Sequence, residues 1–256
     1  MALTLYIVHG SHPCATVQRA LELKGIDHDV VELPPPLHAA LQRVRFGART
    51  VPAVRFDDGE KLVGSRAILD RIERLVPEPP LLPGDPQERT AVLRAEEWGD
   101  QVFQPIARRL LWPALRRRPA AMPSYAEGSR MPLPAVAIRA MAPLATRIEI
   151  KLNGADEGAV RADLLSLPGH LDRIDGWIAD GMMGGAAPNR ADLQIASTLR
   201  LLMTIGDVRP LVEGRPAAEL ALRLFGPLAG EVPAGVYPPA WLPAPARAAT
   251  ASPAAS

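Results

Sequence analysis

The sequence is poor in cysteine, in net charge and in long apolar runs, and each shortage excludes a class of protein. The single cysteine, Cys14, excludes an intramolecular disulfide and a cysteine-rich metal site, and it is typical of a reducing compartment. A net charge of +1 gives no reason to expect nucleic acid or an anionic membrane as a partner. No stretch approaches the roughly 18–20 apolar residues of a membrane span, and residues 1–8 lack the basic region of a signal peptide. We therefore expect a soluble, cytoplasmic protein.

The first third of the chain alternates between strand-like and helix-like patterns. Strands are predicted at 3–8, 28–33, 51–56 and 61–63, and helices at 15–24, 37–46 and 65–75. Asp57-Asp58-Gly59 is a hairpin signal between the last two strands. The order β-α-β-α-β-β-α is the thioredoxin-like arrangement, so residues 1–77 are predicted to form a thioredoxin-like, thiol-binding domain.

Beyond a proline-rich linker at residues 78–87, the strand signal vanishes. Helical patterns cover 88–118, 132–152, 156–179, 189–205 and 216–224, and Pro105 and Pro113 are expected to bend the first of these. Residues 238–256 are rich in proline, alanine and serine, which is typical of a disordered tail. The sequence thus predicts two domains, α+β followed by all-α, with the helical domain spanning 88–237.

Two short segments of the first domain carry the chemistry. Residues 10–14 place the hydroxyl of Ser11 and the thiol of Cys14 at the start of a helix, where free backbone N–H groups and the helix dipole favour an anion. Val51 and Pro52 come just before a short apolar strand, where a proline removes an N–H donor and offers a cis bond, so that the backbone there is able to face a ligand. Together the two segments indicate a thiol-binding site.

Four motifs, in this order and spacing, resemble the soluble glutathione S-transferases over almost the full length, except the tail and residues 122–131. Residues 11–14 (Ser-His-Pro-Cys) stand where that family keeps its activating Ser, Tyr or Cys. Val51-Pro52 resembles the family's valine–cis-proline pair, whose valine backbone pairs with the cysteinyl unit of glutathione. Residues 64–68 resemble Glu/Gln-Ser-x-Ala-Ile, in which the serine holds the γ-glutamyl carboxylate, and residues 189–192 resemble the capping box of the helical domain. The arginine-rich composition fits a bacterial member.

The resemblance implies glutathione as co-substrate, with Val51, Pro52, Ser65 and Arg66 as its binding residues. The chain departs from the family at Gly64, where Glu or Gln is usual, so one contact to the γ-glutamyl group is missing. Ser65 retains its hydroxyl and its N–H at a helix start, and Arg66 adds a charge-assisted contact to a carboxylate. The identity of the thiol stays open between glutathione and a related low-molecular-weight thiol.

Three residues compete for the catalytic role. Ser11 either caps the helix or donates its hydroxyl to a bound thiolate, which lowers the pKa of that thiol. Cys14 is either a buried core thiol or the nucleophile of a mixed disulfide, and His12 is either merely exposed or a base. The remaining histidines show no metal-ligand spacing, so no metal is expected: His9, His28, His38 and His170.

Three functions follow from this site. The first is a glutathione S-transferase-like enzyme that conjugates the thiol to an apolar electrophile. The second is a Cys14-dependent oxidoreductase of the glutaredoxin type, and the third is a non-catalytic binding protein with the same fold. The family resemblance also implies a homodimer, with Leu62, Val63 and Ile68 as interface material and Asp100 of one chain near the thiol site of the other.

Overall fold

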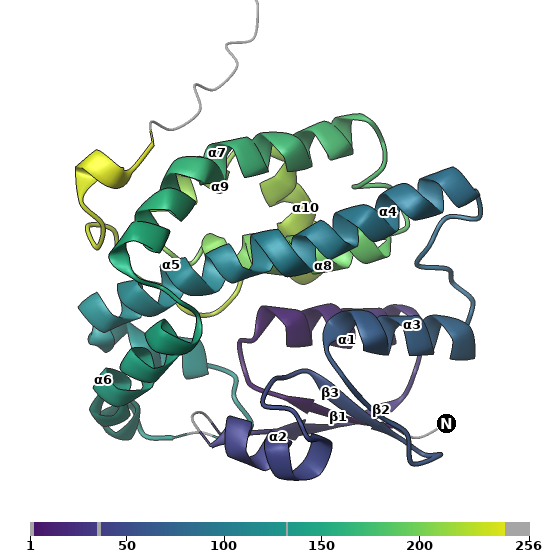
Figure 1. Ribbon diagram of the computed structural model, residues 1–256, viewed down its shortest axis with the longest axis horizontal. Helices are drawn as coiled ribbons and strands as arrows, with labels where there is room; N and C mark the ends of the chain where they lie inside the picture. Colours follow the sequence, from purple (N-terminus) through teal and green to yellow (C-terminus); the bar gives the residue numbers. More distant parts are fainter. Residues whose placement is uncertain (1–2, 35–36, 132, 244–256) are drawn as a thin grey trace, which may run out of the picture.

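The computed structural model describes residues 3–34, 37–131 and 133–243, and its first domain is built on a four-stranded sheet (Figure 1). The strands are β1 (Leu3–Ile7), β2 (His28–Glu32), β3 (Ala53–Phe56) and β4 (Lys61–Val63), in the spatial order β2-β1-β3-β4. β1 pairs in parallel with β2 and antiparallel with β3, and β3 and β4 form the predicted hairpin. Apart from Thr4, the residues of β1 are apolar or aromatic and are buried, because the strand is central and helices cover both faces of the sheet.

Helices cover both faces of this sheet. α1 (His12–Leu23) and α3 (Ser65–Leu75) lie on one face, and α2 (His38–Phe46) lies on the other (Figure 1). The thioredoxin-like arrangement predicted from the sequence is confirmed. α1 begins three residues earlier than the periodicity indicated, because Pro13 fits the first turn of a helix, where a backbone N–H has no partner to lose. Ser11 is therefore the N-cap residue.

The second domain is helical within the described residues. Its helices are α4 (Pro86–Trp98), α5 (Gln104–Arg117), α6 (Ala135–Leu152), α7 (Glu157–Ala179), α8 (Arg190–Leu202), α9 (Arg209–Val212) and α10 (Pro216–Phe225), with 3₁₀ turns at Pro119–Ala126 and Pro239–Trp241. α8 is buried along nearly its whole length, which makes it the central helix of the domain. In the described part, no helix is both long enough and apolar enough to cross a membrane. Residues 244–256 of the predicted tail lie outside the described residues.

The long predicted helix is interrupted just before Pro105. A π-helical segment (Gly99–Phe103) separates α4 from α5, and the N–H of Gln104 donates to the carbonyl of Gly99 five residues back. Because Pro105 has no N–H to continue the regular pattern, a widened turn at this point keeps the two helices continuous. Gly99 also permits a close approach of α8, since a Cβ there would lie 2.8 Å from a side-chain carbon of Ile195. Pro113 stays inside α5.

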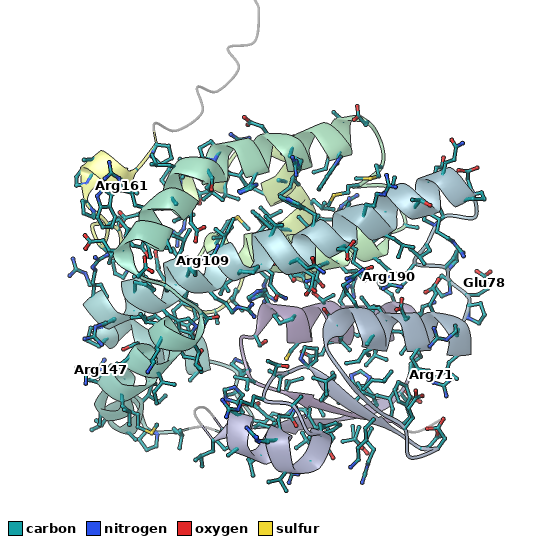
Figure 2. All side chains as sticks on the ribbon, viewed as in Figure 1. Arg71, Glu78, Arg109, Arg147, Arg161 and Arg190 are labelled. Carbon is teal, nitrogen blue, oxygen red and sulfur yellow. The ribbon has the colours of Figure 1, made fainter. Side chains whose placement is uncertain are left out.

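Polar bonds along α8 join the two domains. The Thr16 hydroxyl of α1 donates to the carbonyl of Leu193 at 3.2 Å and lies 2.9 Å from the hydroxyl of Ser197. Arg190 is buried against Glu96 at 2.8 Å and also pairs with Asp70 of α3; Figure 2 shows Arg190 at the junction of the domains. The start of α8 carries the predicted capping box, in which the side chains at 189 and 192 bond reciprocally to backbone N–H groups. The helical domain is thereby held against α1 and α3.

Candidate thiol-binding site

Ser11 stands at the N-cap of α1 without acting as a cap. Its backbone is extended (φ −70°, ψ 117°), yet its hydroxyl accepts no capping hydrogen bond from a backbone N–H of the helix. The Ser11 N–H donates to the carbonyl of Val8 at 3.1 Å, and this turn fixes the residue at the end of β1. A hydroxyl released from capping, beside the unpaired N–H groups of a helix start, is suited to stabilise a bound anion.

Cys14 is buried one turn into α1, in the core of the first domain. Its side chain is 1% exposed, and burial raises the pKa of the thiol to about 11. Hydrogen bonds to the Ser11 side chain and the Val8 backbone act in the opposite direction but are weaker. The thiol is therefore protonated at neutral pH and is shielded from a disulfide partner. This burial favours the interpretation of Cys14 as a core thiol over that of a mixed-disulfide nucleophile.

His12, expected to be either exposed or a base, is instead buried. Burial, and then the nearby charge of Arg108 on α5, lowers the pKa of His12 to about 3. Its imidazole is thus neutral across the physiological range, and the Nε2 atom is buried without a hydrogen-bond partner. A neutral imidazole with this pKa is a weak base, which argues against the role of a general base for His12.

The Val51–Pro52 peptide bond is cis, as the sequence predicted. The carbonyl of Pro52 accepts a hydrogen bond from the N–H of Gly64 at 2.9 Å, which ties this loop to the residue that precedes α3. Gly64 has a φ of +94°, in the region that favours glycine, so the backbone itself explains why a glycine stands there. The predicted binding residues Val51, Pro52 and Ser65 therefore come together through one backbone contact.

Ser65 and Arg66 open α3 and already have partners in the protein. The hydroxyl of Ser65 is buried and donates to Oε1 of Gln194 on α8 at 3.0 Å. The guanidinium of Arg66 bonds to Glu97 of α4 at 3.3 Å and lies 4.0 Å from Glu96. A ligand at the start of α3 is left with the backbone N–H groups of the first turn as donors and the hydroxyl oxygen of Ser65 as an acceptor.

The helical domain adds charged groups on the side that faces α1 and α3. Asp100, Arg108 and Glu149 are partly buried and influence one another. Burial raises the pKa of both carboxyls, while the positive charge of Arg108 acts in the opposite direction on each. The charge of Arg66 also acts on Asp100, so the cluster reaches the start of α3. Sequence analysis singled out Asp100 but missed Glu149, because no local pattern relates α6 to α5.

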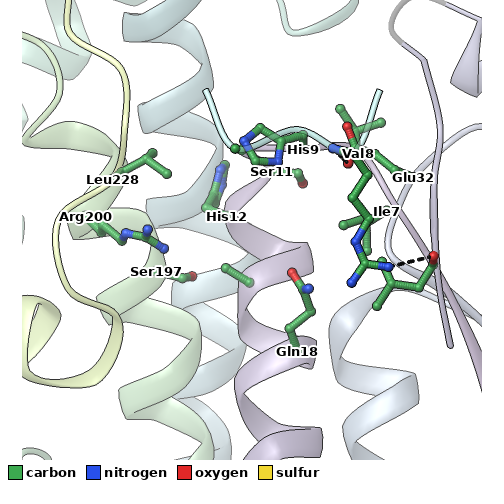
Figure 3. Close-up of a pocket in the computed structure, with 15 residues that line it drawn as sticks. Ile7, Val8, His9, Ser11, His12, Gln18, Glu32, Ser197, Arg200 and Leu228 are labelled. Atoms are coloured by element: carbon green, nitrogen blue, oxygen red, sulfur yellow. Dashed lines mark hydrogen bonds between the residues drawn. The ribbon is translucent and has the colours of Figure 1, made fainter. Parts of the chain in front are cut away.

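A cavity of about 280 Å³ lies beside the N-terminal end of α1. Ser11 and His12 line it, together with residues of β2 and α8 (Figure 3). The other predicted site residues do not line it: Cys14, Val51, Pro52, Ser65 and Arg66. Of the predicted site residues, only Ser11 and His12 therefore border this cavity. Among the described residues, no group of three or more His, Cys, Asp or Glu side chains is arranged to hold a metal ion.

The first domain is thioredoxin-like and is joined to a helical domain; it carries a serine hydroxyl at the start of α1 and a cis-proline before β3. Residues 5–80 match the N-terminal domain of glutathione S-transferases. A maleylacetoacetate isomerase from Pseudomonas aeruginosa is 34% identical over 96 residues, which are 34% of this chain and 43% of that protein. The chain thus matches less than half the length of this curated relative.

Solved structures extend the likeness to both domains. A glutathione S-transferase from Rhodospirillum rubrum F11 is 21% identical, with a TM-score of 0.56 over 87% of this chain and 86% of the other. One from Methylobacterium radiotolerans, crystallised in complex with glutathione sulfonate, is 19% identical, with a TM-score of 0.52 over 90% and 96% of the two chains. These likenesses show the fold. The first domain, over residues 5–80, is also similar in sequence to the N-terminal domain of glutathione S-transferases.

Proposed function

We propose that the protein is a glutathione-dependent enzyme that activates the thiol of glutathione at Ser11 and directs the sulfur at an apolar electrophile. The observation that carries the proposal is the Ser11 hydroxyl, which holds the N-cap position of α1 without capping it. A hydroxyl that donates to a thiolate favours the charged form and lowers the pKa of the thiol. More of the nucleophile then exists at neutral pH.

The glutathione lies, in this proposal, between the Val51–Pro52 loop and the start of α3. The Val51 backbone pairs with the cysteinyl unit, and the N–H groups of Ser65 and its neighbours hold the γ-glutamyl carboxylate, with Arg66 adding a positive charge. Gly64 supplies no side chain to this group. The glutathione sulfonate in the Methylobacterium radiotolerans structure supports glutathione as the ligand. Cys14 has no part in the chemistry, because its thiol is buried and its pKa is raised.

Calorimetric titration with glutathione, followed by an assay of thioether formation with an apolar electrophile, tests the proposal. We expect one site per chain, weakened by Arg66→Met and unchanged by Arg161→Met, which removes an exposed arginine on α7. No binding of glutathione by the folded protein would reject the proposal. Binding without turnover would instead support the non-catalytic alternative, to which Gly64 and the engaged Ser65 hydroxyl already point.

An isomerase is the second candidate, favoured by the maleylacetoacetate isomerase relative. Addition of a thiolate to a conjugated double bond, rotation about the resulting single bond and loss of the thiolate would need the same activated sulfur. The two reactions differ in whether glutathione is consumed. Free thiol that falls with the electrophile indicates a transferase, and a change of substrate geometry at constant thiol indicates an isomerase.

We also propose that two chains pair as a homodimer, in the cytoplasm that the single cysteine favours. Of the interface residues expected from the sequence, Ile68 is fully buried in the core of its own domain, so it is not available to a partner. Leu62 and Val63 on β4 are only half-buried. Light scattering that gives the mass of a single 27.5 kDa chain at micromolar concentration would reject the dimer.

A further inference from the structure

We propose that the outer face of α6 docks the protein on the surface of a bilayer that contains anionic lipids. Of the described residues, twelve large hydrophobic side chains are exposed, and seven of these lie between Met131 and Leu152. Exposed apolar side chains scattered singly need no explanation, but a contiguous group of them marks an interaction surface. The inference does not rest on the glutathione chemistry, because no residue of this face belongs to the candidate thiol-binding site.

The exposed apolar residues of α6 form one row along the helix. They recur at every fourth position, so they follow one side of it: Val136, Ala140, Leu144, Ile148 and Leu152. Val136, Leu144 and Leu152 are 76%, 62% and 63% exposed. The buried residues Ala142 and Thr146 each stand two positions from Leu144, which is about 160° around the helix. The row therefore faces away from the side by which α6 packs against α5, and α6 lies at the edge of the molecule (Figure 1).

The exposed charges of α6 are all basic, and they follow the row on one flank. Arg139, Arg147 and Lys151 each come three positions after a member of the row, so they lie beside it on the same side. None of them has a carboxylate partner among the described residues. Figure 2 shows Arg147 at the outer edge of the molecule. Long basic side chains of this kind keep their charge in water while their stems cover apolar surface.

The acidic groups of this region are turned inward or lie beyond the end of the row. Glu149, the one carboxylate of α6, is half-buried; it accepts a hydrogen bond from Nδ2 of Asn153 at 3.1 Å and interacts with the charge of Arg108 on α5. Asp156 and Glu157 follow the helix, and Asp156 caps α7. The row is thus flanked by positive charge. The net charge of +1 does not reveal this, because charges elsewhere in the chain balance it.

This combination fits an anionic lipid surface better than a second copy of the chain. A two-fold pairing of α6 would bring the same unpaired cations of both copies together, and like charges across an interface are unfavourable. A bilayer supplies the opposite charge in its headgroups. An amphipathic helix with Lys and Arg beside an apolar face lies in the plane of such an interface, with the apolar face about 5–10 Å deep. The 18 residues of α6 span about 27 Å, so the whole row contacts the surface at once.

Sedimentation with vesicles tests this docking surface. Wild type should sediment with vesicles of phosphatidylcholine and phosphatidylglycerol in equal parts and much less with phosphatidylcholine alone, and added salt should weaken the binding. Leu144→Glu places a charge in the middle of the row at an exposed position, so it should abolish sedimentation while the circular dichroism stays that of wild type. Leu222→Glu is the matched control; it changes a leucine that is 46% exposed on α10 and should leave sedimentation unchanged.

A second set of variants tests the charges beside the row. Arg147→Met combined with Lys151→Met should weaken binding to the anionic vesicles by about fivefold per charge, whereas Arg74→Met, which removes an exposed arginine of α3, should have no effect. The proposal is overturned if wild type does not sediment with the anionic vesicles, or if Leu144→Glu and Leu222→Glu sediment equally. In the first case, binding of an acidic amphipathic peptide that Leu144→Glu abolishes would assign the face to a protein partner, and loss of a wild-type dimer in that variant would assign it to a second copy.

Discussion

Replacement of Ser11 by alanine separates the chemistry of the site from its stability. An N-cap serine that caps its helix usually contributes about 0.5–2 kcal/mol, but Ser11 makes no capping bond, so Ser11→Ala should lower the free energy of unfolding by less than this range. The hydrogen bond to a bound thiolate is charge-assisted and contributes roughly 1.5–3 kcal/mol. Its loss should lower kcat/KM by about 10- to 100-fold.

The same loss should appear in the pH dependence. Because the hydroxyl stabilises the charged form of the thiol, its removal raises the pKa of bound glutathione by about 1–2 units, at 1.36 kcal/mol per unit. The midpoint of the rise of kcat with pH should therefore move upward in Ser11→Ala. At pH values well above both midpoints, the difference in rate between the two proteins should narrow.

Ser166→Ala is the matched control, since Ser166 lies on α7 and its hydroxyl only donates to a backbone carbonyl of its own helix at 3.1 Å. It should change neither the rate nor the midpoint. If Ser11→Ala folds normally and keeps the wild-type rate and pH midpoint, the thiol is activated elsewhere and the role given to Ser11 is wrong. His12, the other residue at this end of α1, would then be the next to replace.

Three further predictions concern buried groups. Cys14→Ser should retain activity within a few-fold, because the thiol is buried with its pKa at about 11, and loss of all turnover in a folded variant would restore the oxidoreductase hypothesis. Arg190→Met should lower the free energy of unfolding in urea by about 3–5 kcal/mol, because buried Glu96 loses its nearest positive charge and keeps only Arg66 at 4.0 Å. Glu96→Gln in the same chain should recover part of this loss, and an unchanged midpoint would contradict the prediction. His12 has a pKa of about 3 when folded and an ordinary value of 6.5, so the unfolded chain binds more protons between these values and stability falls as pH drops through that window. His12→Gln should remove up to about 1.4 kcal/mol per pH unit from this slope, and an identical slope in both proteins would refute the assignment.

The sequence by itself determined the order of the elements and the local features of the site. Alternating and 3.6-residue periodicities found the strands and most helices, because these patterns record which face of each element is buried. The capping box at Asn189 and Asp192 was equally readable, since both partners lie within one helical turn. The cis bond at Val51–Pro52 followed from the family resemblance and was confirmed.

Only the tertiary structure decided how the site residues are used. The burial of His12 and the bond from Ser65 to Gln194 both depend on how the helical domain packs against the first domain. Ser65 and Gln194, for example, are 129 residues apart in the chain, and no local sequence pattern relates them. Desolvation and long-range contacts, which set the charge state of His12 and Cys14, arise from that packing alone. The sequence therefore named the groups at the start of α1, and the packing of the two domains decided which of them face a ligand.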